Sequence, residues 1–384
     1  MNATRGETPL PNEASAAPPL RRAPVLTLRG VRCTAVQVPL RYVLGTSAAV
    51  VREAPLVLVD LETEEGVTGR SYLFAYRASG AHAIGAVLHE AAGLVRGEPV
   101  APLAIAAKLE RRYALLGVTG IARMALSALD TALWDALAVA AGMPLAILLG
   151  GTLRPLRAYN SCGLGLMSPD AAADEAVRLL EGGFKAVKLR LGYPTLAEDL
   201  AVTRAVRKRL PDAVELLVDY NQALSVVDAL ARGRALDDEG VAWLEEPIRH
   251  DDSRGNAEIA RALRMPLQLG ENFDGPKALA DALDAQACDL VMPDLGRIGG
   301  VSGWMQAAGV AAARGVPMSS HLMPEISAHL LAATPTCHWL EYVDWLDPLV
   351  QQPMRVQDGL AEVPDRPGIG LVWDAAAVEH HRIG

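Results

Sequence analysis

The sequence has few cysteines, and they follow no pattern. Its four cysteines, Cys33, Cys162, Cys288 and Cys337, lie far apart along the chain. Their spacing matches neither a zinc site nor the framework of a small disulfide-linked domain. We therefore expect reduced thiols in a cytoplasmic protein.

The sequence also lacks long apolar runs and an excess of positive charge. No uninterrupted apolar run reaches the roughly 18 residues that a membrane span needs, and no charged-then-apolar signal opens the chain. The net charge is −9, which argues against nucleic acid as a partner. Since 51% of the residues are apolar and 21% are charged, we expect an ordinary globular chain with neither a membrane nor a nucleic acid as partner.

Changes in pattern divide the chain into four parts. Residues 1–24 are rich in Pro, Ala and Glu without a period, which predicts a disordered tail. Residues 25–150 combine strand-like alternation with helical stretches, which predicts an α+β unit. Residues 151–350 alternate between strand and helix patterns. Residues 351–384 hold turn signals and one apolar run, and we expect them to pack back on the first unit.

Three carboxylates follow short apolar runs at equal intervals. Asp219, Glu245 and Glu271 are separated by 26 positions and again by 26, and each closes a run typical of a buried parallel strand. In a (β/α) barrel this period brings successive strand ends to one rim. Three acids there repel one another unless a cation holds them, and oxygen ligands suit Mg²⁺. The alternative is three solvated acids at helix starts.

Polar residues mark the strand ends in both directions from these acids. Lys188 and Arg190 precede them, and Asp294, His321 and Glu341 follow, so that seven successive strand ends are marked at steps of 20 to 31 positions. Stretches rich in Ala, Leu, Arg and Asp lie between them. The alternation predicts an α/β fold whose parallel strands gather these side chains at one rim.

The segments that carry these residues resemble the enolase superfamily, and within it the mandelate racemase subgroup. The resemblance covers nearly the whole chain after residue 24 and is carried by AVKLRLGYP, VDYNQ, EEP, LGEN, MPDLGRIGG and the stretch from PMSSH to HWLE. It implies a (β/α)7β modified TIM barrel with an N-terminal α+β capping domain. It also implies one Mg²⁺ per subunit held by Asp219, Glu245 and Glu271, a small hydroxy-carboxylate substrate and a homo-oligomer.

The resemblance implies a role for each remaining rim residue in abstracting the proton α to a carboxylate. His321 would be the base, with Asp294 accepting a hydrogen bond from its other ring nitrogen. Glu341 would donate a hydrogen bond to the substrate carboxylate, which requires surroundings that raise its pKa. Lys188 would lie beside that carboxylate, and Asn221 would contact the substrate from the end of a continuing strand.

Three positions depart from the subgroup's pattern. Arg190 replaces a lysine that serves as a second base on the face opposite the histidine, and a guanidinium does not readily give up its proton. Gly163 falls where the subgroup has a serine near the substrate carboxylate, so one hydroxyl contact would be missing. Arg52 lies in the capping loop TSAAVVREAPL, where the subgroup has a small and apolar loop. It suits a polar or anionic distal group of the substrate, and the alternative is a solvated loop arginine.

These observations leave three functions. We expect dehydration of an acid sugar or aldarate, since loss of the α-proton and the β-hydroxyl requires only the face of His321. The second is a racemase or epimerase of a 2-hydroxy acid by 1,1-proton transfer, with Arg190 as an unusual base. The third is an inactive metal-binding scaffold, against which the complete set of ligands together with His321 and Asp294 argues.

Overall fold

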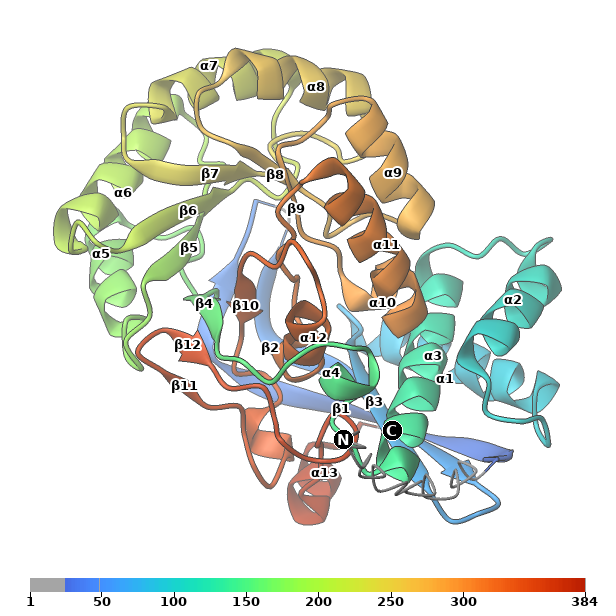
Figure 1. Cartoon of the computed structure of the whole chain (residues 1–384). Helices are drawn as coiled ribbons and strands as arrows, with labels where there is room; N and C mark the ends of the chain where they lie inside the picture. Colours follow the sequence, from blue (N-terminus) through green and yellow to red (C-terminus); the bar gives the residue numbers. More distant parts are fainter. Residues whose placement is uncertain (1–24, 48, 384) are drawn as a thin grey trace, which may run out of the picture.

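A closed barrel of parallel strands forms the centre of the molecule (Figure 1). The computed structural model describes residues 25–47 and 49–383, so the predicted disordered tail lies outside the described residues. Met318 pairs in parallel with Val291 and Cys337, and the last strand pairs with the first, which closes the barrel. The labelled strands are β4 (Leu156–Asn160), β5 (Ala186–Arg190), β6 (Glu215–Asp219), β7 (Val241–Glu245), β8 (Leu267–Leu269), β9 (Leu290–Val291) and β10 (Leu340–Tyr342).

Helices cover the outside of the barrel and begin at residues suited to that position. Ser168 and Ser225 accept hydrogen bonds from the first turns of their helices, and Thr195 forms a capping box with Glu198, as expected for N-caps. The helices are α5 (Pro169–Arg178), α6 (Leu196–Arg209), α7 (Val226–Leu236), α8 (Ser253–Ala262), α9 (Pro276–Asp284), α10 (Leu295–Ile298), α11 (Gly300–Arg314) and α12 (Pro324–Ala332). The predicted (β/α)7β barrel is confirmed.

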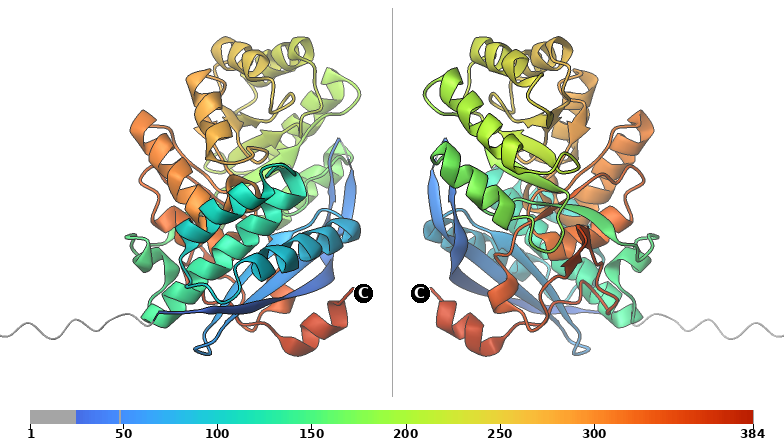
Figure 2. Two further views of the ribbon diagram at one scale, coloured as in Figure 1. Left: turned by 90° about the vertical axis from the view of Figure 1, so that its right-hand side faces the viewer. Right: turned by 90° about the vertical axis from the view of Figure 1, so that its left-hand side faces the viewer.

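The capping domain combines a three-stranded antiparallel sheet with helices on one side of the barrel (Figure 2). The sheet consists of β1 (Leu28–Gly45), β2 (Val50–Thr63) and β3 (Thr68–Phe74). The helices are α1 (Ala78–Leu94), α2 (Pro102–Tyr113), α3 (Gly120–Ala141) and the short α4 (Leu145–Leu148). The expected α+β capping domain is therefore present, and its β2–β3 turn lies near the predicted residues 64–66.

Helix α3 forms the core of the capping domain. By length and composition it could cross a membrane, but 72% of its most apolar window is buried inside the protein. It packs closely on β3, because a Cβ atom at Gly69 would lie 2.1 Å from the carbonyl oxygen of Ala132. Glycine at this position therefore permits the contact between sheet and helix.

The C-terminal segment contacts both parts of the molecule. It contains η1 (Asp347–Leu349), β11 (Val356–Gln357), β12 (Leu360–Ala361) and α13 (Ala375–His381). Strand β12 pairs antiparallel with β4 of the barrel, whereas the indole nitrogen of Trp373 donates to Asp60 of β2 at 3.0 Å. The segment therefore joins the capping sheet to the edge of the first barrel strand.

One buried carboxylate fastens this segment to the capping domain and gives a testable prediction. Asp135 accepts hydrogen bonds from the backbone N–H groups of Arg70 and Ile369, each at 2.6 Å. Asp135→Ala should lower the free energy of unfolding by about 2–4 kcal/mol, because two backbone donors lose their partner. Urea unfolding measures this change. Asp365→Ala, at an exposed position of the same segment, should stay within about 0.5 kcal/mol of the parent, and equal stabilities of the two variants would contradict the assignment.

Candidate active site

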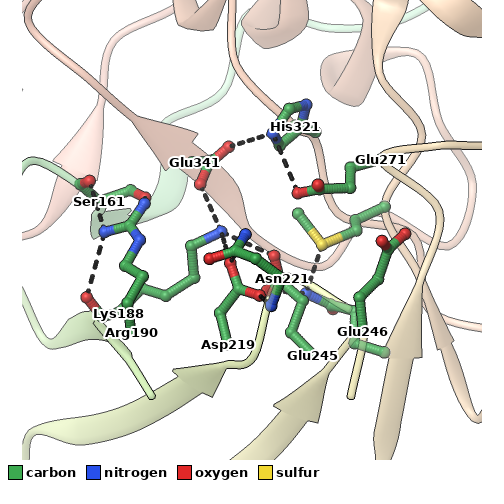
Figure 3. Close-up of polar contacts among 12 residues, drawn as sticks. Ser161, Lys188, Arg190, Asp219, Asn221, Glu245, Glu246, Glu271, His321 and Glu341 are labelled. Atoms are coloured by element: carbon green, nitrogen blue, oxygen red, sulfur yellow. Dashed lines mark hydrogen bonds and ion pairs between the residues drawn. The ribbon is translucent and has the colours of Figure 1, made fainter. Parts of the chain in front are cut away.

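The side chains predicted to share one rim converge at the C-terminal ends of the barrel strands (Figure 3). Lys188 and Arg190 lie on β5, Asp219 and Glu245 end β6 and β7, and Glu341 lies on β10. Glu271 follows β8 by two residues, and Asp294 forms a bridge with His321. Because parallel strands end at the same side of a barrel, residues far apart in the chain become neighbours here.

Asp219, Glu245 and Glu271 form an oxygen-lined site for a cation. One carboxylate oxygen from each lies within 4.8 Å of the others. Burial, together with the charges of Asp219 and Glu271, raises the pKa of Glu245 to about 8 despite the opposing effect of Lys188. This repulsion and the all-oxygen donor set fit Mg²⁺, which would offset the negative charge.

Lys188 supplies positive charge inside the same cluster. Its ammonium group lies 2.7 Å from Glu245, 2.8 Å from Glu341 and 3.5 Å from Asp219. Burial by itself would lower the pKa of Lys188, but the attraction of Glu245 and Glu341 outweighs it and raises the pKa well above its usual value. Lys188 is therefore held in the cationic state.

The charge state of Glu341 differs from the expectation. Burial favours its neutral form, but Lys188 and His321 outweigh burial and lower the pKa of Glu341 below its usual value. Its Oε2 atom also accepts a hydrogen bond from the backbone N–H of Leu322 at 2.8 Å. The direction is opposite to the expected rise, because the ammonium group of Lys188 contacts this carboxyl group at 2.8 Å. Both contacts favour the carboxylate form of Glu341.

His321 and Asp294 form a buried pair on the other side of the cation site. The Nδ1 atom of His321 lies 2.7 Å from Asp294 Oδ2, while the other oxygen of Asp294 accepts from the backbone N–H groups of Gly296 and Arg297. Asp294 is thus fixed and holds the imidazole with Nε2 facing Glu271 at 3.2 Å. Burial lowers the pKa of His321, but Glu271, Glu341 and Asp294 together raise it to about 9. A cation held by Glu271 would offset part of this effect.

Arg190 directs its guanidinium toward the loop that follows β4. Its Nη1 atom donates to the carbonyl oxygens of Ser161 and Gly163 at 2.9 and 2.8 Å, and Nη2 donates to the hydroxyl of Ser161 at 2.8 Å. The Nε atom is buried without a partner among the described residues. The described hydrogen bonds of Arg190 therefore hold the loop after β4 and do not reach the three carboxylates.

Ser161 is a site residue that was not predicted from the sequence. Its hydroxyl contacts Arg190 and contributes to lowering the pKa of Glu341. Gly163 cannot carry a serine, because its φ is +65° and a Cβ atom there would lie 2.3 Å from Glu175 Oε1. Ser161, two residues earlier, places a hydroxyl beside Arg190 and Glu341. The loss of a substrate contact at Gly163 stays a prediction. Ser161 directly follows Asn160, the last residue of β4, in the place that the rim residues take after the other strands.

Asn221 and Arg52 lie differently from the expectation. Strand β6 ends at Asp219, and Asn221 has a left-handed φ of +46°. Its backbone N–H and side-chain amide donate to Asp219 at 2.8 and 3.0 Å, and its Oδ1 atom is buried without a partner among residues 25–47 and 49–383. The assumed continuation of the strand was wrong, although Asn221 remains at the site. Arg52 is exposed on β2, and none of the described contacts brings it to the carboxylates.

A polar network extends the site beyond the three carboxylates. The side-chain amide of Asn272 donates to Glu246 at 2.7 Å and to Glu271 at 3.2 Å, and its oxygen accepts from Arg297 at 2.7 Å. The guanidinium of Arg297 lies 4.9 Å from the centre of the Tyr76 ring in the capping domain. Glu271 is thus oriented by Asn272, which the capping domain supports through Arg297.

Comparisons with known proteins agree with this geometry. Residues 28–150 match the model of the mandelate racemase / muconate lactonizing enzyme N-terminal domain, and residues 171–377 match the enolase C-terminal domain-like model. An L-talarate/galactarate dehydratase of Salmonella typhimurium is 33% identical over 326 residues, which cover 85% of this chain and 82% of the relative.

Solved structures show the same arrangement. An enolase from an alphaproteobacterium, solved with bound magnesium, is 45% identical with a TM-score of 0.91, covering 93% of this chain and all of that one. A mutant L-talarate/galactarate dehydratase with magnesium and L-glucarate is 30% identical with a TM-score of 0.89, covering 96% of each chain. Both halves of the chain and its rim of carboxylates thus agree with one family, and the chain belongs to the mandelate racemase / muconate lactonizing enzyme family of the enolase superfamily.

Proposed function

We propose that this protein is a Mg²⁺-dependent dehydratase of an acid sugar or aldarate. The observation that carries the proposal is the asymmetry of the rim. His321 has an acceptor in Asp294 at 2.7 Å, whereas the two cations of β5 are bound to carboxylates and carbonyl groups. A proton can therefore be taken and returned on the side of His321. The related dehydratase with magnesium and L-glucarate supports the substrate class.

The proposed reaction removes one water molecule from the substrate. His321 takes the proton from the carbon next to the carboxylate through Nε2, and Asp294 stabilises the imidazolium that forms. Mg²⁺ bound by Asp219, Glu245 and Glu271 would supply positive charge where the enediolate develops. The β-hydroxyl then leaves as water after receiving a proton from His321, and the resulting enol becomes a 2-keto acid.

Lys188, Arg190 and Asn221 have supporting roles in this proposal. Lys188 keeps its charge beside the carboxylates and stabilises negative charge on the substrate carboxylate. Arg190 holds Ser161, and through it Glu341, in place. Asn221 offers its free Oδ1 atom, an acceptor, to a substrate hydroxyl. Arg52, which is exposed on β2, stays a candidate for contact with a distal polar group of the substrate.

The racemase or epimerase alternative requires a base on the face of Lys188 and Arg190. Lys188 is held by Glu245 and Glu341, and Arg190 donates to Ser161 and Gly163. A guanidinium also keeps its proton near neutral pH. We therefore favour one-sided chemistry. A homo-oligomer in the cytoplasm is part of the proposal, because relatives in this family are commonly symmetric assemblies and the thiols fit a reducing compartment. Light scattering tests the assembly.

The cation site gives the first prediction for this function. Glu245→Gln should weaken Mg²⁺ binding at least tenfold and abolish turnover, because one anionic ligand is lost from a site of three. Isothermal titration calorimetry measures the affinity. Glu215→Gln, at the start of β6 and therefore at the opposite end of that strand from Asp219, should bind Mg²⁺ like the parent. Turnover that persists in a chelator would show that the carboxylates do not serve a metal.

The base gives the second prediction. His321→Asn should lower the rate at which the substrate α-proton exchanges with deuterated solvent by about 10²–10⁴-fold, because Asn cannot accept and hold a proton. Mass spectrometry of recovered substrate follows the exchange, and calorimetry should show that Mg²⁺ still binds. Exchange of one stereoisomer at a near-parental rate would place a working base on the side of Arg190 and favour the epimerase.

A further inference from the structure

The chain adopts a strained turn directly after His321. Leu322 and Met323 have φ angles of +51° and +42°, in the left-handed region that non-glycine residues rarely adopt. Such residues persist only where surrounding contacts hold them. Helix α12 begins at the next residue, Pro324. The position of His321 therefore depends on what holds this turn and the start of α12.

Two of the contacts that support this turn come from residues of the barrel domain itself. The backbone N–H of Leu322 donates to Glu341 at 2.8 Å, and the hydroxyl of Ser327 donates to the carbonyl oxygen of Leu322 at 2.9 Å. The first contact joins the turn directly to an active-site carboxylate. A shift of the turn would therefore move both His321 and its neighbour Glu341.

The third contact comes from the capping domain. The hydroxyl of Tyr72, on β3, donates a hydrogen bond to Glu325 Oε2 in the first turn of α12. Tyr72 is 4% exposed and Glu325 is 3% exposed, so water does not compete for this bond. The other oxygen, Oε1, has no partner among the described residues. Tyr72 is thus the side chain that fixes the carboxyl group of Glu325.

The same strand also contacts the support of Asp294. A Cβ atom at Gly296, in the short helix that Asp294 caps, would lie 2.9 Å from Leu73 Cδ2. Strand β3 therefore touches the backbone that carries each member of the histidine–aspartate pair. Neither Tyr72 nor Leu73 contacts the three carboxylates of the cation site.

We propose that Tyr72 and Glu325 are positioning residues through which the capping domain holds the turn after His321 and keeps the imidazole aligned on Asp294. The inference rests on the proposed function in that His321 is the base. Their hydrogen bond joins the capping sheet to the barrel. The alignment of the base therefore depends on how the capping domain packs on the barrel. A small displacement of a catalytic group lowers the reaction rate by a large factor. The contact between Tyr72 and Glu325 therefore affects the rate although it lies away from the substrate.

The test uses Tyr72→Phe and Glu325→Gln in the full-length, Mg²⁺-loaded protein. Tyr72→Phe keeps the ring and removes the hydroxyl. The matched control is Ser71→Ala, because Ser71 is buried on the same strand and donates to the carbonyl oxygen of Ala128 at 2.8 Å, away from α12. Four quantities are measured: the melting temperature, kcat and KM on an acid sugar that the parent converts, and the proton NMR signal of the His321 Nδ1–H group, assigned with His321→Asn.

We expect Tyr72→Phe to lower kcat roughly 10- to 100-fold with KM within about twofold, since alignment of the base and not binding is affected. The Nδ1–H signal should broaden or disappear as the bond to Asp294 loosens. Glu325→Gln, which keeps an acceptor for Tyr72, should retain most of kcat. Ser71→Ala should lower the melting temperature but keep both kcat and the signal.

The opposite result would overturn the proposal. If Tyr72→Phe keeps kcat and the Nδ1–H signal and only lowers the melting temperature as Ser71→Ala does, the contact is structural. If no acid sugar is converted by the parent, the proposed function fails separately, and the NMR signal alone then decides. A signal that is unchanged in Tyr72→Phe would refute the positioning role, and a signal lost in this variant but kept in Ser71→Ala would support it.

Discussion

The repulsion among carboxylates buried at one barrel rim is the constraint on which the site depends. Asp219, Glu245, Glu271 and Glu341 share this rim with one buried ammonium group, that of Lys188. One ammonium cannot offset four carboxylates, and the raised pKa of Glu245 reflects burial together with the remaining repulsion. A divalent cation at Asp219, Glu245 and Glu271 would reduce this imbalance and would supply positive charge where the enediolate develops. The same carboxylates thus bind the cation and set the charge that the proposed proton abstraction needs.

This constraint also makes the two sides of the site unequal. On one side, Lys188 is held by Glu245 and Glu341, and Arg190 is held by Ser161 and Gly163. On the other side, His321 pairs with Asp294, whose second oxygen is fixed by the start of α10. One side is suited to stabilising negative charge, and the other to moving a proton. The capping domain supports this second side, since β3 contacts both Glu325 and Gly296.

The sequence predicted the barrel and the carboxylate site because both follow from spacing. A period of 26 residues sets consecutive parallel strands, so the strand ends must meet at one rim whatever the loops do. The contacts of individual side chains depend on loop geometry and were predicted less well. The hydroxyl beside Glu341 was not located from the sequence, because the loop after β4 has a left-handed φ at Gly163 and Ser161 lies beside Glu341. The charge state of Glu341 depends on the ammonium group of Lys188, 153 positions earlier in the chain. The role of Arg190 depends on backbone carbonyl groups, which no sequence motif marks.

The central claim is that protons move on the side of His321 only. The most direct measurement is to incubate the Mg²⁺-loaded parent protein in deuterated water with each of the two α-epimers of one acid sugar, and to analyse both product and remaining substrate by NMR and mass spectrometry. The account predicts that one epimer gives the 2-keto acid and that remaining substrate keeps its α-configuration. Recovered substrate with the opposite α-configuration and deuterium at the α-carbon would contradict it, because that product requires a working base on the side of Lys188 and Arg190.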